Sequence, residues 1–146
     1  MTANAATVRD ETFAMVAAAV AAWDATVKLY WEGVPTSTAN PSPGPNDTWA
    51  RVSLMHVTGR QSSLAGVDGV RRWNRTGFIS VQCFAPLARG SVQRATQLAC
   101  VVRDALQGKQ TASCVWFRNP RISEVGEDKD WFNVNAIIDF DYDELR

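Results

Sequence analysis

The sequence predicts an α+β domain in which a mainly antiparallel sheet carries two helices packed on one face. Three observations lead to this fold class: two segments place apolar residues at helical spacing, several segments alternate apolar and polar residues, and turn-forming residues separate them. The expected order of elements is α-β-ββ-α-β-β, as in layered α+β domains. With 146 residues, 46% of them hydrophobic, the chain has the size and composition of a single domain over residues 1–146.

The first helix is expected from about Val8 to Lys28, with Thr7 in a capping pair at its start. Its apolar residues recur at alternating spacings of three and four, which places on one stripe Phe13, Val16, Val20, Trp23 and Val27. A short strand over Leu29–Trp31 is expected next. The segment Val34–Asp47 contains four of the six prolines and is expected to form a long loop.

A long hairpin is expected in the middle of the chain. Its first strand, Trp49–Val57, alternates between two faces, and its second lies at Phe78–Phe84 within the segment Val70–Pro86. The intervening segment Thr58–Gly69 contains the glycine and serine residues of a flexible loop. The tip of this hairpin is therefore expected to be polar and basic.

The second half of the chain adds a helix and two strands. Ser91 is a favourable cap for a helix over Val92–Gln107. A fourth strand over Cys114–Arg118 is expected to end at Asn119-Pro120, and a charged turn at Gly126–Asp130 follows. The last strand has an apolar face formed by Phe132, Val134, Ala136, Ile138, Phe140 and Tyr142. We expect the stripe of the first helix to pack against this face.

The residue patterns that mark common enzymes do not occur. The sequence has no G-x-S-x-G, P-loop, G-x-G-x-x-G or H-E-x-x-H. The single histidine, His56, falls on the apolar side of a strand, which favours a hydrogen-bonded core or interface residue. Cys83, Cys100 and Cys114 form no CxxC pair, so three buried thiols are favoured over a zinc site. We therefore expect no enzyme activity, no cofactor and no metal.

Three aspartates alternate along the polar face of the last strand: Asp139, Asp141 and Asp143. Neighbouring carboxylates in such a row stand about 7 Å apart, because a strand rises ~3.3 Å per residue. A cation held there would need further ligands, which the sequence does not indicate. A row of carboxylates that contacts solvent or another subunit is the favoured interpretation.

The charges are separated along the chain although the 15 basic and 15 acidic side chains cancel. Residues 51–121 carry a net charge of +9, whereas residues 122–146 carry −6. Subunits could therefore associate head to tail through unlike patches and close into a ring. Alternatively, the fold could bring the two segments together within one subunit, and the sequence leaves both interpretations open.

The candidate interface residues follow from this separation and from the aromatic and arginine content of interfaces. They are Arg71, Arg72, Trp73, Arg75 and Trp49 on the basic side, and Asp139, Asp141, Asp143 and Glu144 on the acidic side. In a ring, the arginines would meet the carboxylates of a neighbour or DNA phosphates in a central channel. Reversing the three arginines to Glu is then expected to spare the fold and impair assembly. A small nucleic-acid-binding module is a weaker alternative.

Four parts of the sequence carry a family resemblance. They are the amphipathic first helix, the segment WARVSLMHV, the arginine-rich stretch leading through GFISVQCFAP into GSVQRATQLACVVRDAL, and the ending WFNVNAIIDFDYDEL. A basic segment followed by an F-x-V-x-x-F-type strand, a proline and an alanine-rich helix is a family pattern. The chain resembles, over nearly its whole length, the tail terminator (tail-completion) proteins of long-tailed bacteriophages. Family members differ in the proline-rich loop and the hairpin tip.

The resemblance implies a structural virion protein that caps the growing tail tube as a ring, usually a hexamer, and then offers a docking surface to the neck of the capsid. The implied partners are further copies of the chain, the tail tube protein, a head-closure or neck protein, and genomic DNA that passes through the channel without sequence-specific binding. The implied location is the tail or neck of the virion, after assembly in the cytoplasm of a host bacterium.

The resemblance transfers no catalytic residues. Within the same setting, another neck or head-closure component is the alternative. No apolar run approaches the ~20 residues of a membrane span, so no membrane partner is expected.

Overall fold

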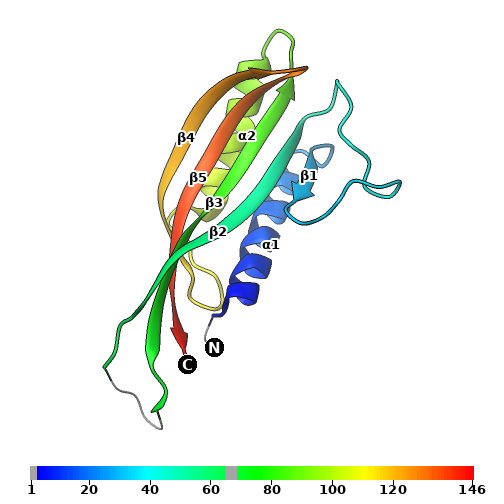
Figure 1. The fold of residues 1–146 in the computed structure, drawn as a ribbon. Helices are drawn as coiled ribbons and strands as arrows, with labels where there is room; N and C mark the ends of the chain where they lie inside the picture. Colours follow the sequence, from blue (N-terminus) through cyan, green and yellow to red (C-terminus); the bar gives the residue numbers. More distant parts are fainter. Residues whose placement is uncertain (1–2, 65–68) are drawn as a thin grey trace.

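Two helices and five strands make up the residues that the structure, a computed structural model, describes: 3–64 and 69–146. Along the chain these elements are α1 (Ala5–Trp23), β1 (Lys28–Trp31), β2 (Trp49–Gln61), β3 (Arg72–Pro86), α2 (Ser91–Leu106), β4 (Trp116–Asp128) and β5 (Trp131–Leu145). The order α-β-β-β-α-β-β and the mostly antiparallel sheet confirm the fold class expected from the sequence (Figure 1).

The sheet has the strand order β1-β2-β3-β5-β4. The short strand β1 runs parallel to β2, and all other neighbours are antiparallel. β3 is the central strand and pairs along its whole length with β5. The C-terminal strand therefore lies between the hairpin and β4, which brings the basic middle of the chain next to its acidic end.

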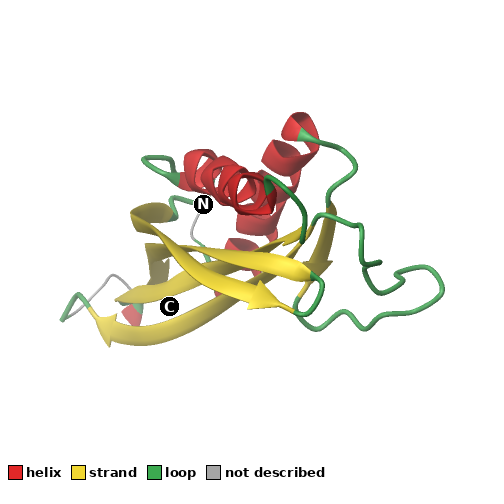
Figure 2. Cartoon of the chain, turned by 90° about the horizontal axis from the view of Figure 1, so that it is seen from above, coloured by secondary structure: helices red, strands yellow, loops and turns green. Residues whose placement is uncertain are grey.

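Both helices lie on the same face of the sheet (Figure 2). α2 packs on β3 and β5 through an apolar stripe that is buried as expected: Ala95, Leu98, Ala99, Val102 and Leu106. α1 packs beside it, against α2 and β2. The expectation that α1 covers β5 was therefore wrong, because α2 occupies that face. Val16 and Val20 are buried, whereas Trp23 is partly exposed and lies 4.5 Å from the guanidinium of Arg94.

The ends of both helices differ from the expected ones. α1 begins after Asn4, whose side chain accepts a hydrogen bond of 2.9 Å from the backbone N–H of Thr7. It ends at Trp23, because Asp24 accepts bonds from the N–H and hydroxyl of Thr26 and so forms a turn. At α2, Gly90 is the cap residue and adopts a φ of 89°, which favours glycine.

Two strands are longer than the sequence indicates. β2 continues to Gln61, so the first part of the expected loop Thr58–Gly69 is a strand; residues 65–68 lie outside the described residues. β4 continues through Asn119-Pro120, where the expected strand ended. This proline is tolerated because β4 is an edge strand and its register with β5 shifts between Arg118 and Arg121.

Candidate interface: the projecting arm of the sheet

One end of the sheet extends beyond the helices (Figure 1). We call this extension the arm and define it as Thr58–Gln61 of β2, Arg72–Thr76 of β3 and Tyr142–Leu145 of β5. β3 lies in the middle and pairs with both other strands. Backbone pairing continues just past the strands, because Arg71 and Arg146 exchange N–H···O=C bonds of 2.6 and 2.9 Å. The basic hairpin of the sequence is therefore joined by the C-terminal strand.

The arm leaves the body at a bulge in β2 between His56 and Thr58. Opposite this bulge lies Gly77 of β3. A Cβ atom added to Gly77 would lie 2.1 Å from the Met55 carbonyl oxygen and 2.6 Å from the ring of Phe140. Because bulges increase the local twist of a strand, the neighbouring strand and ring come closer here than any side chain would allow.

Arg75 lies over Gly59, the glycine of β2 within the arm. A Cβ on Gly59 would lie 2.2 Å from Nη1 of Arg75, so the missing side chain leaves room for the guanidinium. Nε of Arg75 forms an ion pair of 3.0 Å with Glu144, whose side chain is 14% exposed. The guanidinium also lies 5.6 Å from the centre of the Trp73 ring. Two charged residues and an aromatic ring thus hold the three strands of the arm together.

The acidic residues of β5 are paired with arginines of the same chain. Arg72 lies 3.7 Å from Asp143, and Arg118 lies 2.9 Å from Asp141. Arg121 donates two hydrogen bonds, of 3.0 and 3.1 Å, to Asp139, which lowers the pKa of that carboxyl despite its partial burial.

These pairs help to decide whether the basic and acidic segments meet between subunits or within one subunit. Asp139, Asp141, Asp143 and Glu144 each have an arginine partner within the subunit. For these residues, the fold itself brings basic and acidic segments together. Their position at a subunit interface stays a prediction. One argument for it was that the arginines need the carboxylates of a neighbouring subunit, and this argument no longer holds for Arg72 and Arg75.

The structure separates one candidate residue from the others. Trp49 lies in the body of the sheet and is 5% exposed. Its ring stacks on Phe84 with centroids 4.1 Å apart and meets the edges of Tyr30 and Trp131. Trp49 therefore has a packing role away from the arm, which the sequence pattern alone did not distinguish from an interface role.

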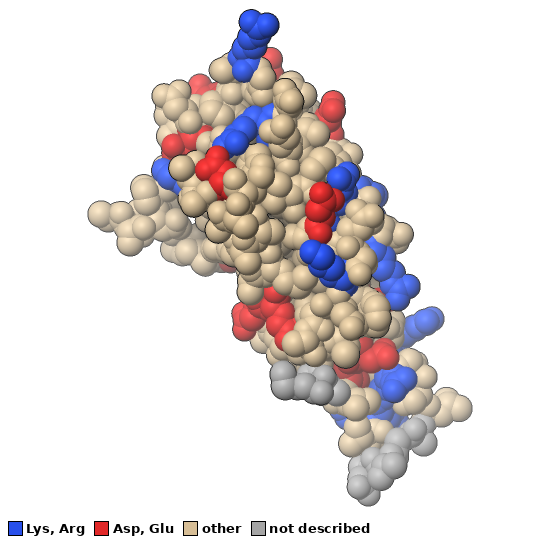
Figure 3. All heavy atoms as spheres, turned by 180° about the vertical axis from the view of Figure 1, so that it is seen from behind, with Lys and Arg blue, Asp and Glu red and all other residues tan. Residues whose placement is uncertain are grey.

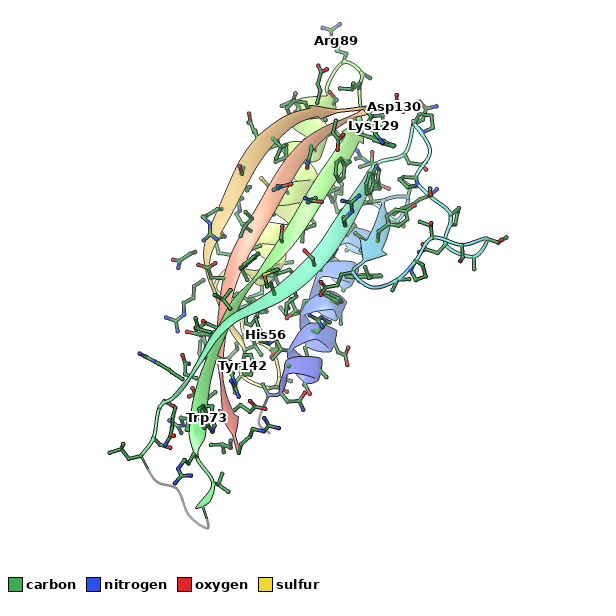
Figure 4. All side chains as sticks on the ribbon, in the orientation of Figure 1. His56, Trp73, Arg89, Lys129, Asp130 and Tyr142 are labelled. Atoms are coloured by element: carbon green, nitrogen blue, oxygen red, sulfur yellow. The ribbon has the colours of Figure 1, made fainter. Side chains whose placement is uncertain are left out.

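The single histidine lies where the arm meets α1 (Figure 4). Nε2 of His56 lies 2.9 Å from the hydroxyl of Tyr142, and its ring meets the edge of Phe140. Burial lowers the pKa of His56, and the nearby positive charges of Arg9 and Arg75 lower it further. Burial raises the pKa of Tyr142. His56 is thus a hydrogen-bonded, half-buried residue, as its place on the apolar side of the strand indicated.

The cysteines differ in burial. Cys83 is buried, which raises the pKa of its thiol, whereas Cys100 is partly exposed and Cys114 is exposed. The expectation of three buried thiols was therefore wrong for two of them, because Cys114 precedes β4 in a turn and Cys100 lies on the side of α2. Within residues 3–64 and 69–146, no group of three or more His, Cys, Asp or Glu side chains is placed to hold a metal ion.

Some charged residues have no ion-pair partner in the described part of the chain, and of these only Arg71 was among the candidates expected from the sequence. On the basic side these include Arg60 and Arg71, near the tip of the arm; on the acidic side they include Glu124, Glu127 and Asp128, toward the end of β4. The arm and the β4–β5 turn, marked by Asp130, lie at opposite ends of the molecule (Figure 4). On the face seen in Figure 3, basic and acidic side chains lie next to each other in several small groups.

The helices that the structure describes are too short or too polar to span a membrane. No protein-family model matches the chain, and no curated protein matches it significantly. One solved protein, whose name describes no function, superposes with a TM-score of 0.67 at 16% sequence identity, over 92% of each chain. A chain from the virion of a native gene transfer agent particle is 18% identical over 92% of this chain and 93% of that chain, with a TM-score of 0.49. The first similarity extends to the fold alone, and the second superposition is too loose to carry an argument.

Proposed function

We propose that this chain is a structural virion protein of a long-tailed bacteriophage, a tail terminator that caps the tail tube as a ring and forms the head–tail junction. The family resemblance of the sequence supports this role. The structural observation that carries it is the arm, a three-stranded extension that the helices leave uncovered.

An uncovered arm of this kind is costly for an isolated subunit. Two or three strands without a packed layer are only marginally stable in water, and open strand edges favour pairing with other chains. The ion pair of Arg75 with Glu144 and the ring of Trp73 keep the arm ordered without a hydrophobic core. A preformed arm of this type suits assembly, because little ordering remains to be done when a partner binds.

A catalytic role is not part of the proposal. His56 is engaged by Tyr142, and a cavity of about 560 Å³ beside it is lined by the arm and the first turn of α1. Among the residues lining this cavity, no serine or cysteine accompanies the histidine as a nucleophile. The proposal therefore includes no substrate, cofactor or metal.

The proposed partners are further copies of the chain in a hexameric ring, the tail tube protein, and a head-closure or neck protein. Genomic DNA would pass the ring without sequence-specific contacts. The pairing of Arg72 and Arg75 within the subunit weakens the alternative of a nucleic-acid-binding module, because paired arginines have less charge to offer phosphates. Another neck or head-closure component remains the alternative role in the same particle.

The proposal is tested by measuring the mass of the purified chain alone and with tail tube protein. A terminator is expected to form a closed ring that binds the end of assembled tubes and halts their growth. In a complementation assay, its loss is expected to give tails of uncontrolled length that do not join heads. Tails of normal length that fail to join heads would instead assign the chain to a neck or head-closure role.

A further inference from the structure

The outer edge of β2 is only partly occupied within the subunit. β1 pairs with β2 from Trp49 to Val52. Beyond this point two side chains satisfy the edge: the N–H of Leu54 donates to Glu32 at 3.1 Å, and Arg9 donates to the carbonyl of Leu54 at 3.0 Å. Arg9 and Glu32 also pair with each other at 3.0 Å, so the edge is closed up to Leu54.

From His56 to Gln61 the same edge is open. The N–H of Ser62 donates to the carbonyl of Arg72 and so faces β3. Because backbone groups alternate in direction along a strand, those of Gln61 and Gly59 face away from β3. Over the part of the chain that the structure describes, no hydrogen bond engages these outward groups. Thr58 to Gln61 are all exposed, so the unpaired edge is accessible.

The cavity of about 560 Å³ near His56 lies over one face of the arm, because its lining includes Arg75 of β3 and Glu144 of β5. It does not cover the outer edge of β2, where Thr58 and Gly59 are exposed and open to an added strand. A paired strand lies about 4.8 Å from its neighbour, and pairing with a sheet edge is a recurrent mode of binding an extended segment.

The charge of this edge indicates which segment it accepts. Arg60 on this edge, and Arg71 just before the adjoining strand β3, lack ion-pair partners in the described part of the chain. At the other edge of the sheet, β4 ends in exposed acidic residues that likewise have no ion-pair partner there: Glu124, Glu127 and Asp128. A basic edge at one end and an acidic edge at the other are complementary between two copies of the chain.

We propose that the β2 edge from His56 to Gln61 accepts the acidic β4 edge, Glu124–Asp128, of a second copy, so that the sheet continues from subunit to subunit. This inference rests on the proposed ring and names the contact that builds it. The two surfaces differ, so the contact is head to tail and forms a ring if the rotation closes. The bulge of β4 between Glu124 and Gly126 limits the paired stretch to a few residues.

The backbone part of this contact is tested by Gln61→Pro, with Gln61→Ala as the matched control. Proline removes the outward N–H of residue 61, and an edge strand tolerates it at such a position. Gln61→Pro is expected to weaken self-association at least about tenfold, while Gln61→Ala, which keeps the N–H, stays at the wild-type level. Circular dichroism verifies that both variants fold.

The charge complementarity of the two edges is tested by Arg60→Glu and Glu127→Arg. Both residues are exposed, so neither substitution disturbs the core. Each reversal alone is expected to weaken self-association by about fivefold or more, and the double reversal is expected to restore it, since neighbouring charges couple. If the double variant instead self-associates more weakly than either single variant, the proposed pairing of these two edges is overturned.

The outcomes separate this inference from the proposed function. Wild-type rings together with normal rings from Gln61→Pro would overturn the β2–β4 contact and leave the terminator role standing. Wild-type chain that stays monomeric with and without tail tubes, and does not bind them, would contradict the terminator role itself. Filaments in place of rings would support the contact between the β2 and β4 edges but contradict the closure of the subunits into a ring.

Discussion

Gly77 shows how a single residue sets the geometry of the arm. Its Cα lies against the Met55 carbonyl and the Phe140 ring, at the point where β2 bulges. The sequence predicts the alternation that buries Phe140, but it gives no sign that Gly77 is needed. That need depends on a neighbouring strand and a ring that are distant in the sequence.

Alanine substitution of Gly77, at the root of the arm, and of Gly59, within it, should have unequal effects. Gly77→Ala is expected to cost about 1–3 kcal/mol or more, because the new Cβ overlaps backbone and a packed ring. Gly59→Ala should cost less, because the atom in its way is the flexible end of Arg75. Free energies of unfolding from denaturant titration test this order. Equal costs would show that the arm relaxes freely at its root.

His56 makes stability depend on pH in a defined direction. Its pKa in the folded chain lies below the ordinary value of 6.5, first because of burial and then because of Arg9 and Arg75, whereas Glu144 acts in the opposite sense. The unfolded chain therefore takes up the proton more readily. The stabilising effect of neutral His56 is full above pH 6.5 and is lost as the pH falls toward the lowered pKa.

The test compares wild type with His56→Gln, which keeps a group able to bond the Tyr142 hydroxyl. The difference between their free energies of unfolding is expected to shift against the wild type as the pH is lowered from 7 to 5. A difference that stays constant over this range would mean that His56 titrates alike in both states.

At the scale of elements, α2 is the centre of the molecule. It contacts α1 beside it and the strands β3 and β5 beneath it, and Leu98 is fully buried in these contacts. Leu98→Ala is expected to cost about 2–5 kcal/mol. Trp23→Ala is expected to cost less than the ~3–5 kcal/mol of a fully buried tryptophan, because Trp23 is partly exposed under Arg94. Denaturant titration of both variants checks the order, and a larger loss for Trp23→Ala would contradict it.

The sequence predicts the elements better than their ends and neighbours. Apolar periodicity identifies the buried stripe of α2 and the apolar face of β5, because burial repeats with the geometry of each element. It does not reveal that β4 passes through Pro120, since that depends on β4 being an edge strand. Nor does it reveal that α2, rather than α1, covers β5, because both helices have suitable stripes.

At the scale of the whole molecule, most of the charge separation of the sequence is resolved within the subunit. The pairing of β3 with β5 places Arg72 and Arg75 opposite Asp143 and Glu144. This register follows from the position of β5 in the sheet, which segment charges do not specify. The sequence named Arg72, Arg75, Asp143 and Glu144 as interface candidates but did not reveal that they pair with one another, and their role at a subunit interface stays a prediction.

Single charge reversals in the arm should therefore differ, which revises the expectation that all three arginines can be reversed without cost to the fold. Arg75→Glu would place a second carboxylate beside Glu144, which is 14% exposed, and should cost roughly 1–3 kcal/mol. Arg71→Glu, in an exposed residue, should stay within about 0.5 kcal/mol. Thermal unfolding of the two variants compares them, and equal stability would show that the Arg75–Glu144 pair contributes little.

The mass of the assembled species tests the central claim most directly. The purified chain is measured by native mass spectrometry or light scattering, alone and with tail tube protein. The account predicts a closed ring of defined subunit number that remains bound to the end of the tube. A chain that stays monomeric in both conditions and does not bind tubes would contradict it.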